Sequence, residues 1–182
     1  MDDQVVALLG EFLVACGKYD TQTRRSQPNV SRAVRLYSEL SPDLVNSADE
    51  DGWTALHHAC GEGALSVVEW LTESTPADIN KLDTTNCTPL WVAAFNNRRD
   101  CVKHLLRLGA NEAIKGAPEG EPISSPALAA RRNRHPGLAD LIEAETSLRN
   151  SDPCRLLRQM SGEMTVEEFR DSMRGLLKPS EL

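Results

Sequence analysis

The sequence predicts an all-α protein made of stacked helix pairs, and two observations support this fold class. First, five positions in the middle of the chain recur at an offset of 34 residues: Thr54 and Thr88, Leu56 and Leu90, Ala59 and Ala93, Val68 and Val102, and Leu71 and Leu105. Second, aromatic residues make up only 4% of the 182 residues, and hydrophobic residues make up 40%. This composition suits thin layers of stacked helices better than one thick core.

The repeated unit resembles the ankyrin repeat. Its two copies share a Thr-x-Leu-x-x-Ala core, at Thr54–Ala59 and Thr88–Ala93, and they close at Asp78 and Asn111. A period near 33 residues with a Thr-Pro-Leu-His-x-Ala core is the signature of that family. The resemblance covers roughly the middle hundred residues and weakens toward both ends. It implies an ankyrin solenoid, in which helix-turn-helix repeats with short β-hairpin turns form a right-angled stack.

Residues 1–48 are predicted to form a degenerate first repeat of two helices that caps the stack. The helices are expected over Asp2–Cys16 and Asn29–Leu40, with a polar loop between them. Apolar residues at helical spacing define their buried faces: Val5, Leu8, Leu9, Phe12 and Leu13 in the first helix, and Val30, Ala33, Val34, Tyr37 and Leu40 in the second. A terminal repeat faces water on one side, so departure from the repeat pattern is expected there.

The two well-formed repeats are predicted over residues 49–82 and 83–115. Thr54 and Thr88 can cap the short helix of each repeat, and Pro89 stands in a first turn, where its missing N–H costs nothing. Small residues let neighbouring short helices approach closely: Ala59, Ala93 and Ala94. The core between repeats is expected from Leu56, Val67, Val68, Leu71, Leu90, Val102, Leu105 and Leu106.

A third, altered repeat is predicted over residues 116–149, where Ser125–Ala130 replaces the core motif and Ala127 replaces its leucine. The hairpin before it is expected to be enlarged, because Lys115–Pro122 is rich in Gly and Pro. Residues 150–182 are predicted to be a C-terminal helical extension. Helices are expected over Cys154–Met160 and after a capping box at Thr165. They either cap the third repeat, which we favour, or bind a partner.

The C-terminal extension also faintly resembles the suppressor-of-cytokine-signalling box, through Pro153–Arg158 and a later Leu177-Lys178-Pro179. That resemblance implies a ubiquitin-ligase substrate adaptor acting through the C-terminal helices. A regulatory subunit that binds an enzyme is a further alternative.

Catalysis and metal binding have little support in the sequence. There is no glycine-rich phosphate loop, and the Cys101–His104 pair lacks a second pair at zinc-finger spacing. His57 occupies the motif histidine, which in the family braces the hairpin by hydrogen bonding. Cys60 and Cys101 fall at packed helix positions, where a thiol behaves as a small hydrophobe. We therefore expect no enzyme, no catalytic or metal-binding residues and no cofactor.

The resemblance implies non-catalytic binding of a protein partner, as an adaptor or scaffold, through hairpin tips and concave helix faces. Carried over residue by residue, the candidate partner-binding residues are Glu50, Asp51, Trp53, Gly61, Glu62, Leu82, Thr84, Thr85, Cys87, Phe95, Asn96, Arg132 and Asn133. Four of them are apolar and are predicted to lie close together and exposed: Trp53, Leu82, Cys87 and Phe95. The alternative is that Trp53 covers its own hairpin and Phe95 inserts between repeats.

A second candidate feature is a basic patch formed by Arg98-Arg99 and Arg131–His135, which suits a phosphopeptide or an acidic segment. The chain as a whole carries a formal charge of −7, which argues against binding to duplex nucleic acid. The acidic start Met1-Asp2-Asp3 and the lack of a long apolar run predict a cytoplasmic or nuclear location without membrane binding. We expect a monomer.

Overall fold

The computed structural model describes residues 3–18, 28–118 and 122–151. The chain divides into two compact units, Met1–Glu143 and Ala144–Leu182, and the division falls inside the last described helix. The described α-helices are α1 (Asp3–Cys16), α2 (Val30–Glu39), α3 (Ala55–Glu62), α4 (Leu65–Ser74), α5 (Pro89–Phe95), α6 (Arg99–Arg107), α7 (Pro126–Arg132) and α8 (Pro136–Ser151), with a 3-10 helix η1 at Pro42–Asn46. In this part of the chain no strand forms, only an isolated antiparallel bridge between Gly116 and Ser124. The predicted all-α class is confirmed.

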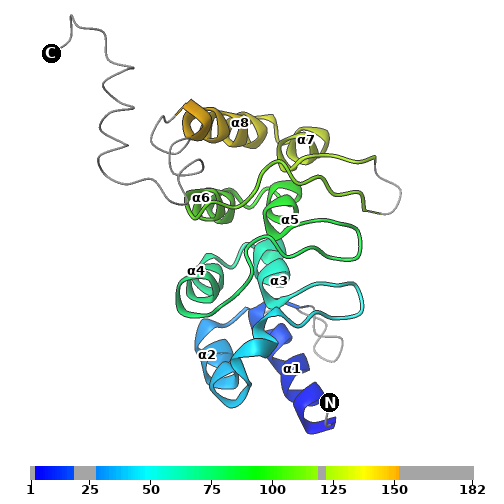
Figure 1. Ribbon diagram of the computed structural model, residues 1–182, viewed down its shortest axis with the longest axis vertical. Helices are drawn as coiled ribbons and strands as arrows, with labels where there is room; N and C mark the ends of the chain where they lie inside the picture. The colour runs from blue at the N-terminus through cyan, green and yellow to red at the C-terminus, as the bar shows by residue number, and fades with distance from the viewer. Residues whose placement is uncertain (1–2, 19–27, 119–121, 152–182) are drawn as a thin grey trace, which may run out of the picture. The chain divides into compact units, whose positions relative to one another are not determined.

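The helices of the first unit stand in two layers. The shorter helices α3, α5 and α7 continue from α1 in one layer, and each packs against the next along the stack. The helices α2, α4 and α6 form the second layer, and the loops before α3 and α5 project away from it (Figure 1). Ala59 and Ala93 are fully buried, as expected of residues where neighbouring short helices approach closely.

The N-terminal repeat packs onto the stack through an aromatic cluster. The Trp70 ring of α4 makes edge-on contacts with the rings of Phe12 and Tyr37, at centroid distances of 6.4 and 5.5 Å. The predicted inward face of α2 is partly wrong, because Val34 is 42% exposed while Leu36, which the periodicity did not select, is buried. Ala33, Leu36 and Leu40 are three or four residues apart and share one helix face, and Val34 is turned away from it.

Local capping explains where the helices begin. The side chains of Asn29, Thr88 and Ser125 each accept a hydrogen bond from the backbone N–H three residues later, which satisfies a donor that the first helical turn leaves free. Pro89 and Pro126 follow two of these caps at the first helical position. The predicted role of Thr88 and Pro89 is confirmed, and Ser125 shows that the altered third repeat keeps the same start.

The continuous core between repeats is also confirmed, since every residue predicted for it is buried. In the third repeat, Ala127 is buried and Leu138, Ala139 and Ile142 complete the core of the first unit. The helices predicted over Cys154–Met160 and from Thr165 onward lie outside the described residues. The predicted domain bounds at 48, 82, 115 and 149 stay a prediction.

The loops that leave the second layer are joined by asparagine side chains. Asn46 Oδ1 accepts a hydrogen bond from the Asp78 backbone N–H at 2.7 Å, and Asn80 Oδ1 accepts one from the Asn111 N–H at 2.8 Å. Asn46 and Asn80 are again 34 residues apart, so one contact recurs at successive repeat junctions.

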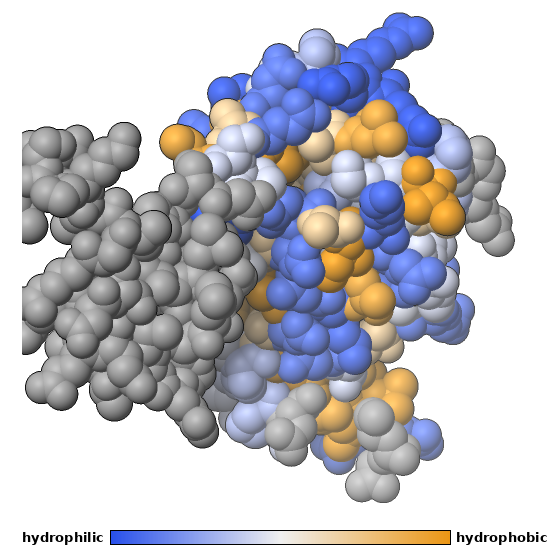
Figure 2. All heavy atoms as spheres, turned by 45° about the horizontal axis from the view of Figure 1, so that its top comes forward, coloured by the Kyte–Doolittle hydropathy of each residue, from blue (hydrophilic) through white to orange (hydrophobic). Residues whose placement is uncertain are grey.

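Several large hydrophobic residues of the described part of the chain are exposed, among them Leu82, Leu108 and Ile123. On the face drawn in Figure 2, hydrophobic residues form several separate patches between hydrophilic residues.

Candidate partner-binding site

Two aspartates shape the hairpin tips. Asp49 Oδ1 accepts hydrogen bonds from the backbone N–H groups two and four residues later, at 3.2 and 2.9 Å. Asp83 Oδ1 does the same in the next repeat, with both distances 2.8 Å. An aspartate that accepts hydrogen bonds from the backbone N–H groups of its own turn stabilises that turn without paired β-strands. The sequence analysis did not select Asp49 and Asp83, although their 34-residue separation could have revealed them.

Backbone contacts connect the tips into a row. The Asp51 carbonyl accepts hydrogen bonds from the Thr84 N–H at 3.2 Å and from the Thr84 hydroxyl at 2.7 Å. The Thr85 carbonyl accepts one from the Ala117 N–H at 3.0 Å. Glycine permits this close approach, because a Cβ atom at Gly52 would lie 2.6 Å from the Thr84 nitrogen. The tips are therefore fixed relative to one another.

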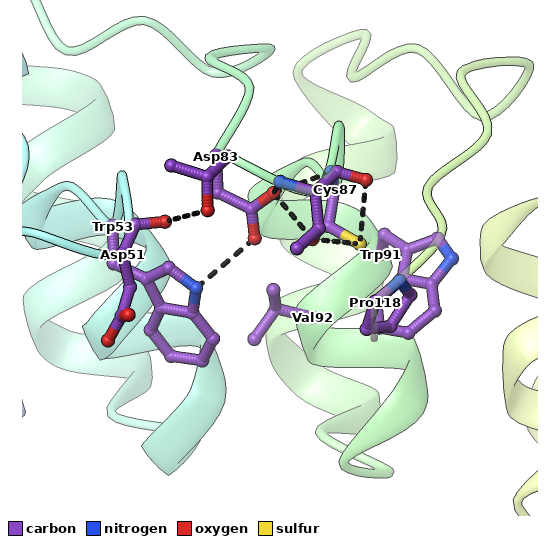
Figure 3. A pocket seen from close by; sticks show the side chains of 9 residues that line it. Asp51, Trp53, Asp83, Cys87, Trp91, Val92 and Pro118 are labelled. Carbon is purple, nitrogen blue, oxygen red and sulfur yellow. Dashed lines mark hydrogen bonds between the residues drawn. The ribbon is translucent and has the colours of Figure 1, made fainter. Parts of the chain in front are cut away.

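Trp53 is half-buried beside this row, and hollows lie on two sides of it. Its indole Nε1–H donates to Asp83 Oδ2 at 3.1 Å, which fixes the ring against the next hairpin. The first hollow has a volume of about 430 Å³, and we call it the Trp53–Trp91 hollow. It is lined by Asp51, Trp53, Asp83, Thr84, Thr85, Cys87, Trp91, Val92 and Pro118. In Figure 3, Trp53 and Trp91 stand on opposite sides with Val92 between them.

The second hollow has a volume of about 400 Å³, and we call it the Trp53–Arg98 hollow. It is lined by Gly17, Lys18, Asp49, Asp51, Trp53, His58, Gly61, Glu62, Asn96 and Arg98. Trp53 and Asp51 line both hollows. Volumes of this size are typical of binding pockets.

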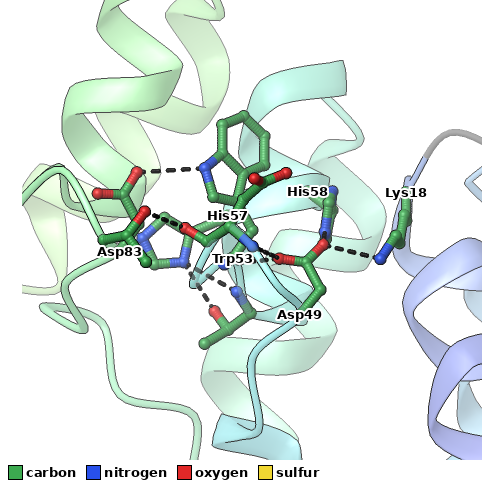
Figure 4. A network of polar contacts seen from close by, with 9 residues as sticks. Lys18, Asp49, Trp53, His57, His58 and Asp83 are labelled. Atoms are coloured by element: carbon green, nitrogen blue, oxygen red, sulfur yellow. Dashed lines mark hydrogen bonds and ion pairs between the residues drawn. The ribbon is translucent and has the colours of Figure 1, made fainter. Parts of the chain in front are cut away.

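His57 braces the two hairpins, as the motif predicts. It is fully buried; its Nδ1 accepts from the Thr54 N–H at 3.2 Å, and its Nε2 lies 3.2 Å from the Cys87 carbonyl (Figure 4). Because a carbonyl only accepts hydrogen bonds, Nε2 carries the proton and Nδ1 has none. Burial lowers the pKa of His57, so this neutral tautomer is the form that the fold holds. In the next repeat Trp91 fills the same position, and its Nε1–H donates to the Ser124 carbonyl at 3.0 Å.

The Asp49 carboxylate contacts both a second histidine, His58 of its own repeat, and Lys18 of the first repeat. Asp49 Oδ2 lies 2.9 Å from both His58 Nε2 and Lys18 Nζ (Figure 4). Burial disfavours charge on the Asp49 carboxyl, but hydrogen bonds from Lys18, Trp53 and His58 outweigh it and lower its pKa. Burial likewise lowers the pKa of His58, although the bond to Asp49 opposes this. His58 is therefore a neutral donor to a charged carboxylate.

The protein is expected to lose stability in mild acid. Because burial lowers the folded-state pKa of His57 and His58, the unfolded chain binds more protons once the pH falls below its histidine pKa. The free energy of unfolding should drop by about 1 kcal/mol between about pH 7.5 and about pH 5.5. Asp49, whose folded-state pKa is lowered, loses its contribution only at lower pH. Urea denaturation at both pH values measures the drop. The variant His57→Gln should show a smaller drop, and an equal drop would place the effect elsewhere.

The structure brings together some of the candidate residues. Those that line at least one hollow are Asp51, Trp53, Gly61, Glu62, Thr84, Thr85, Cys87 and Asn96. Glu50 and Leu82, which is 43% exposed, lie outside both. The Arg132 guanidinium donates to the Pro122 carbonyl, and the Asn133 amide donates to the Phe95 carbonyl.

The expected exposed apolar group is therefore partly wrong. Cys87 is only 2% exposed, because its thiol is packed where Gly116 approaches. Phe95 is half-buried and stacks on Trp91 with ring centroids 5.1 Å apart. The Trp53 ring lies 5.1 Å from that of His58 in α3 of its own repeat, and the indole lines both hollows. Of the four, Trp53 alone is a half-buried wall of these hollows.

Two arginines of the expected basic patch, Arg98 and Arg131, make side-chain contacts within the fold. Arg98 Nε donates to the Gly61 carbonyl at 2.8 Å and so joins two repeats. Arg131 forms ion pairs with Asp140 and Glu143 at 2.9 and 3.2 Å. The expected basic patch is thus reduced, because a paired guanidinium offers less charge to a ligand.

The thiols of Cys60 and Cys101 are not set up for nucleophilic chemistry. Burial raises the pKa of Cys60 well above its ordinary value and that of Cys101 to about 11, so both stay protonated, and both are buried as the sequence predicts. Over residues 3–18, 28–118 and 122–151, no group of three or more His, Cys, Asp or Glu side chains could hold a metal ion. Within the same ranges, no helix is long and apolar enough to cross a membrane.

Comparisons with known proteins agree with this architecture. A family model described as ankyrin repeats in three copies matches residues 26–115. The chain is 31% identical over 131 residues to palmitoyltransferase Hip14 of Drosophila melanogaster, covering 70% of this chain and 20% of that protein. It is 43% identical over 96 residues to the probable E3 ubiquitin-protein ligase XBOS31 of Oryza sativa subsp. japonica, covering 52% and 21%. It is 26% identical over 174 residues to the phosphate system positive regulatory protein PHO81 of Saccharomyces cerevisiae, covering 93% and 14%.

The chain thus spans about a fifth or less of the length of these relatives. What they share with it is the repeat region, whose helix pairs, braced hairpins and recurring turn contacts are described above. The chain belongs to the ankyrin-repeat family, whose repeats are protein-interaction modules.

Proposed function

We propose that this chain is a non-catalytic adaptor that binds a protein partner across its hairpin tips and short helices. The observation that carries the proposal is the position of Trp53 as the common wall of two hollows. A tryptophan held in place by Asp83 offers a large rigid surface at little entropic cost, and such residues are frequent binding hot spots.

Polar residues beside Trp53 are also available to a partner. The carboxylates of Asp51 and Glu62 line these hollows, are exposed, and accept no hydrogen bond from the described residues. The backbone under them is fixed, since the Asp51 carbonyl is bonded to the next tip. A fixed backbone is suited to recognition, because its binding costs little conformational entropy. We expect the adaptor to work as a monomer in the cytoplasm.

An affinity capture experiment tests this proposal. The double variant Asp51→Arg/Glu62→Arg reverses both charges without removing a side-chain hydrogen bond between described residues. Its matched control is Glu39→Arg/Glu73→Arg, which makes the same charge change at exposed positions in α2 and α4. We expect the intact chain and the control to capture the same partner from cell extract, and the site variant to capture at least about tenfold less.

The comparison is valid once circular dichroism and thermal unfolding show that all three proteins fold alike. A partner held equally by the site variant and the control would contradict a binding site around Trp53.

A further inference from the structure

We propose that the Trp53–Trp91 hollow receives a basic side chain, the guanidinium or ammonium group of an arginine or lysine, from the protein partner. The inference rests on the proposed binding function and names the chemistry of one contact within it. Three features of the hollow support it: its aromatic walls, a lining with two carboxylates and no basic side chain, and its shortage of free hydrogen-bond donors.

The walls suit a flat or methylene-rich cation. The half-buried Trp53 and the 5% exposed Trp91 line the hollow on opposite sides, and Val92 lies between them (Figure 3). The face of an indole attracts a cation through its quadrupole, and tryptophan is the best of the aromatic residues for this purpose. The methylene stem of an arginine or lysine can pack against Val92, while its charged end lies beside the carboxylates of Asp51 and Asp83.

The charge in the hollow is negative. Asp51 and Asp83 line it, and the described lining includes no lysine, arginine or histidine. The Asp51 carboxylate accepts no hydrogen bond from the described residues, and Asp83 Oδ2 accepts one, from the Trp53 indole. Since a carboxylate oxygen has two lone pairs, Asp83 Oδ2 can accept a second donor.

The donors in the hollow, by contrast, are already used. The four N–H and O–H groups of its side chains bond within the fold: Trp53 Nε1 to Asp83, Thr84 Oγ1 to the Asp51 carbonyl, Thr85 Oγ1 to Asp83 Oδ1, and Trp91 Nε1 to the Ser124 carbonyl. The hollow thus offers free acceptors and no free O–H or indole N–H donor. A ligand that fits must donate hydrogen bonds, and guanidinium and ammonium groups donate without accepting.

The neighbouring Trp53–Arg98 hollow differs in the charges of its lining residues. It contains Lys18 and Arg98 together with Asp49, Asp51 and Glu62, so its charges are mixed. Lys18 is paired with Asp49 inside it. A cation is therefore better matched to the Trp53–Trp91 hollow, and an anionic phosphopeptide is disfavoured there.

Tryptophan indole signals in the NMR spectrum of the ¹⁵N-labelled full chain provide the test. The chain has three tryptophans, and Trp70, which packs against Phe12 and Tyr37, is an internal control. The probes are blocked pentapeptides of Gly and Ser with a central arginine, lysine or citrulline; citrulline resembles arginine in shape but has no charge. We expect the arginine and lysine peptides to move the Trp53 and Trp91 signals saturably, and the citrulline peptide and Trp70 to show no such change.

A matched pair of variants connects the response to the hollow. Asp51→Asn should weaken arginine-peptide binding by about threefold or more, because it removes a charge and keeps the shape. Glu73→Gln makes the same chemical change on the exposed side of α4 and should leave binding unchanged. The inference is overturned if the arginine peptide moves neither signal, if citrulline acts equally, or if Asp51→Asn binds as the intact chain does.

The two experiments can fail separately. If Asp51→Arg/Glu62→Arg no longer captures the partner, while the arginine and lysine peptides move neither indole signal, the binding function is upheld and the basic-side-chain contact is overturned. Saturable peptide binding with no site-dependent partner would overturn the binding function and uphold a cation site.

Discussion

Replacing Leu90 with alanine is expected to lower the free energy of unfolding by about 2–5 kcal/mol, the range for a buried leucine in a packed core. Leu90 is fully buried in α5, which packs between α3 and α7 in the middle of the stack. Because each repeat is stabilised mainly by its neighbours, a cavity at this position weakens the contacts on both sides. Urea denaturation followed by circular dichroism measures the loss.

Leu128→Ala is the matched control for this prediction. Leu128 lies in α7, a short helix of the same layer, but it is 38% exposed, so its truncation leaves less cavity. We expect a loss of about 1 kcal/mol or less, because part of its surface already contacts water. Equal losses for the two variants would contradict the assignment of Leu90 to the inter-repeat core.

Gly52→Ala is expected to cost about 2–4 kcal/mol, for two separate reasons. The residue has φ of +81°, a left-handed conformation that side chains rarely adopt. A Cβ atom would also lie 2.6 Å from the Thr84 nitrogen, which donates to the Asp51 carbonyl across the row of hairpin tips. Thermal and urea unfolding of the variant measure the total cost.

Gly109→Ala separates these two causes. Gly109 has φ of +87°, yet a Cβ atom there would meet nothing within 4 Å. It should therefore show only the conformational cost, about 1–2 kcal/mol. The excess loss in Gly52→Ala measures the contact between hairpin tips, and a loss no larger than that of Gly109→Ala would show that the tips can separate freely.

Much of the fold could be predicted from the sequence, because each repeat is specified by local sequence features that recur in the next repeat. The 34-residue offset identified the helix pairs, Thr88 and Pro89 identified a helix start, and the aliphatic positions identified the inter-repeat core. Prediction failed where there was no second copy to compare. In the degenerate first repeat, helical spacing alone selected Val34 instead of Leu36.

The candidate site was less predictable, because it depends on which atoms face each other across repeats. Cys87 occupies a position that the family varies, but Gly116 approaches it closely enough to bury the thiol. From the sequence alone we assigned Arg98 to an exposed basic patch. In the structure its Nε–H donates a hydrogen bond to the Gly61 carbonyl of the preceding repeat. Such contacts join residues about a repeat apart and leave no mark in the local pattern.

By itself the sequence determined the repeat architecture, the helix starts and the motif histidine, since periodicity and capping act over a few residues. Only the tertiary structure decided that Asp49 and Asp83 bond to the backbone of their own hairpin tips and that Trp53 lies between two hollows. It also decided that Asp51, whose carboxylate accepts no hydrogen bond from the described residues, lines both hollows. These properties depend on distances between side chains of different repeats, which packing fixes and a linear pattern cannot specify.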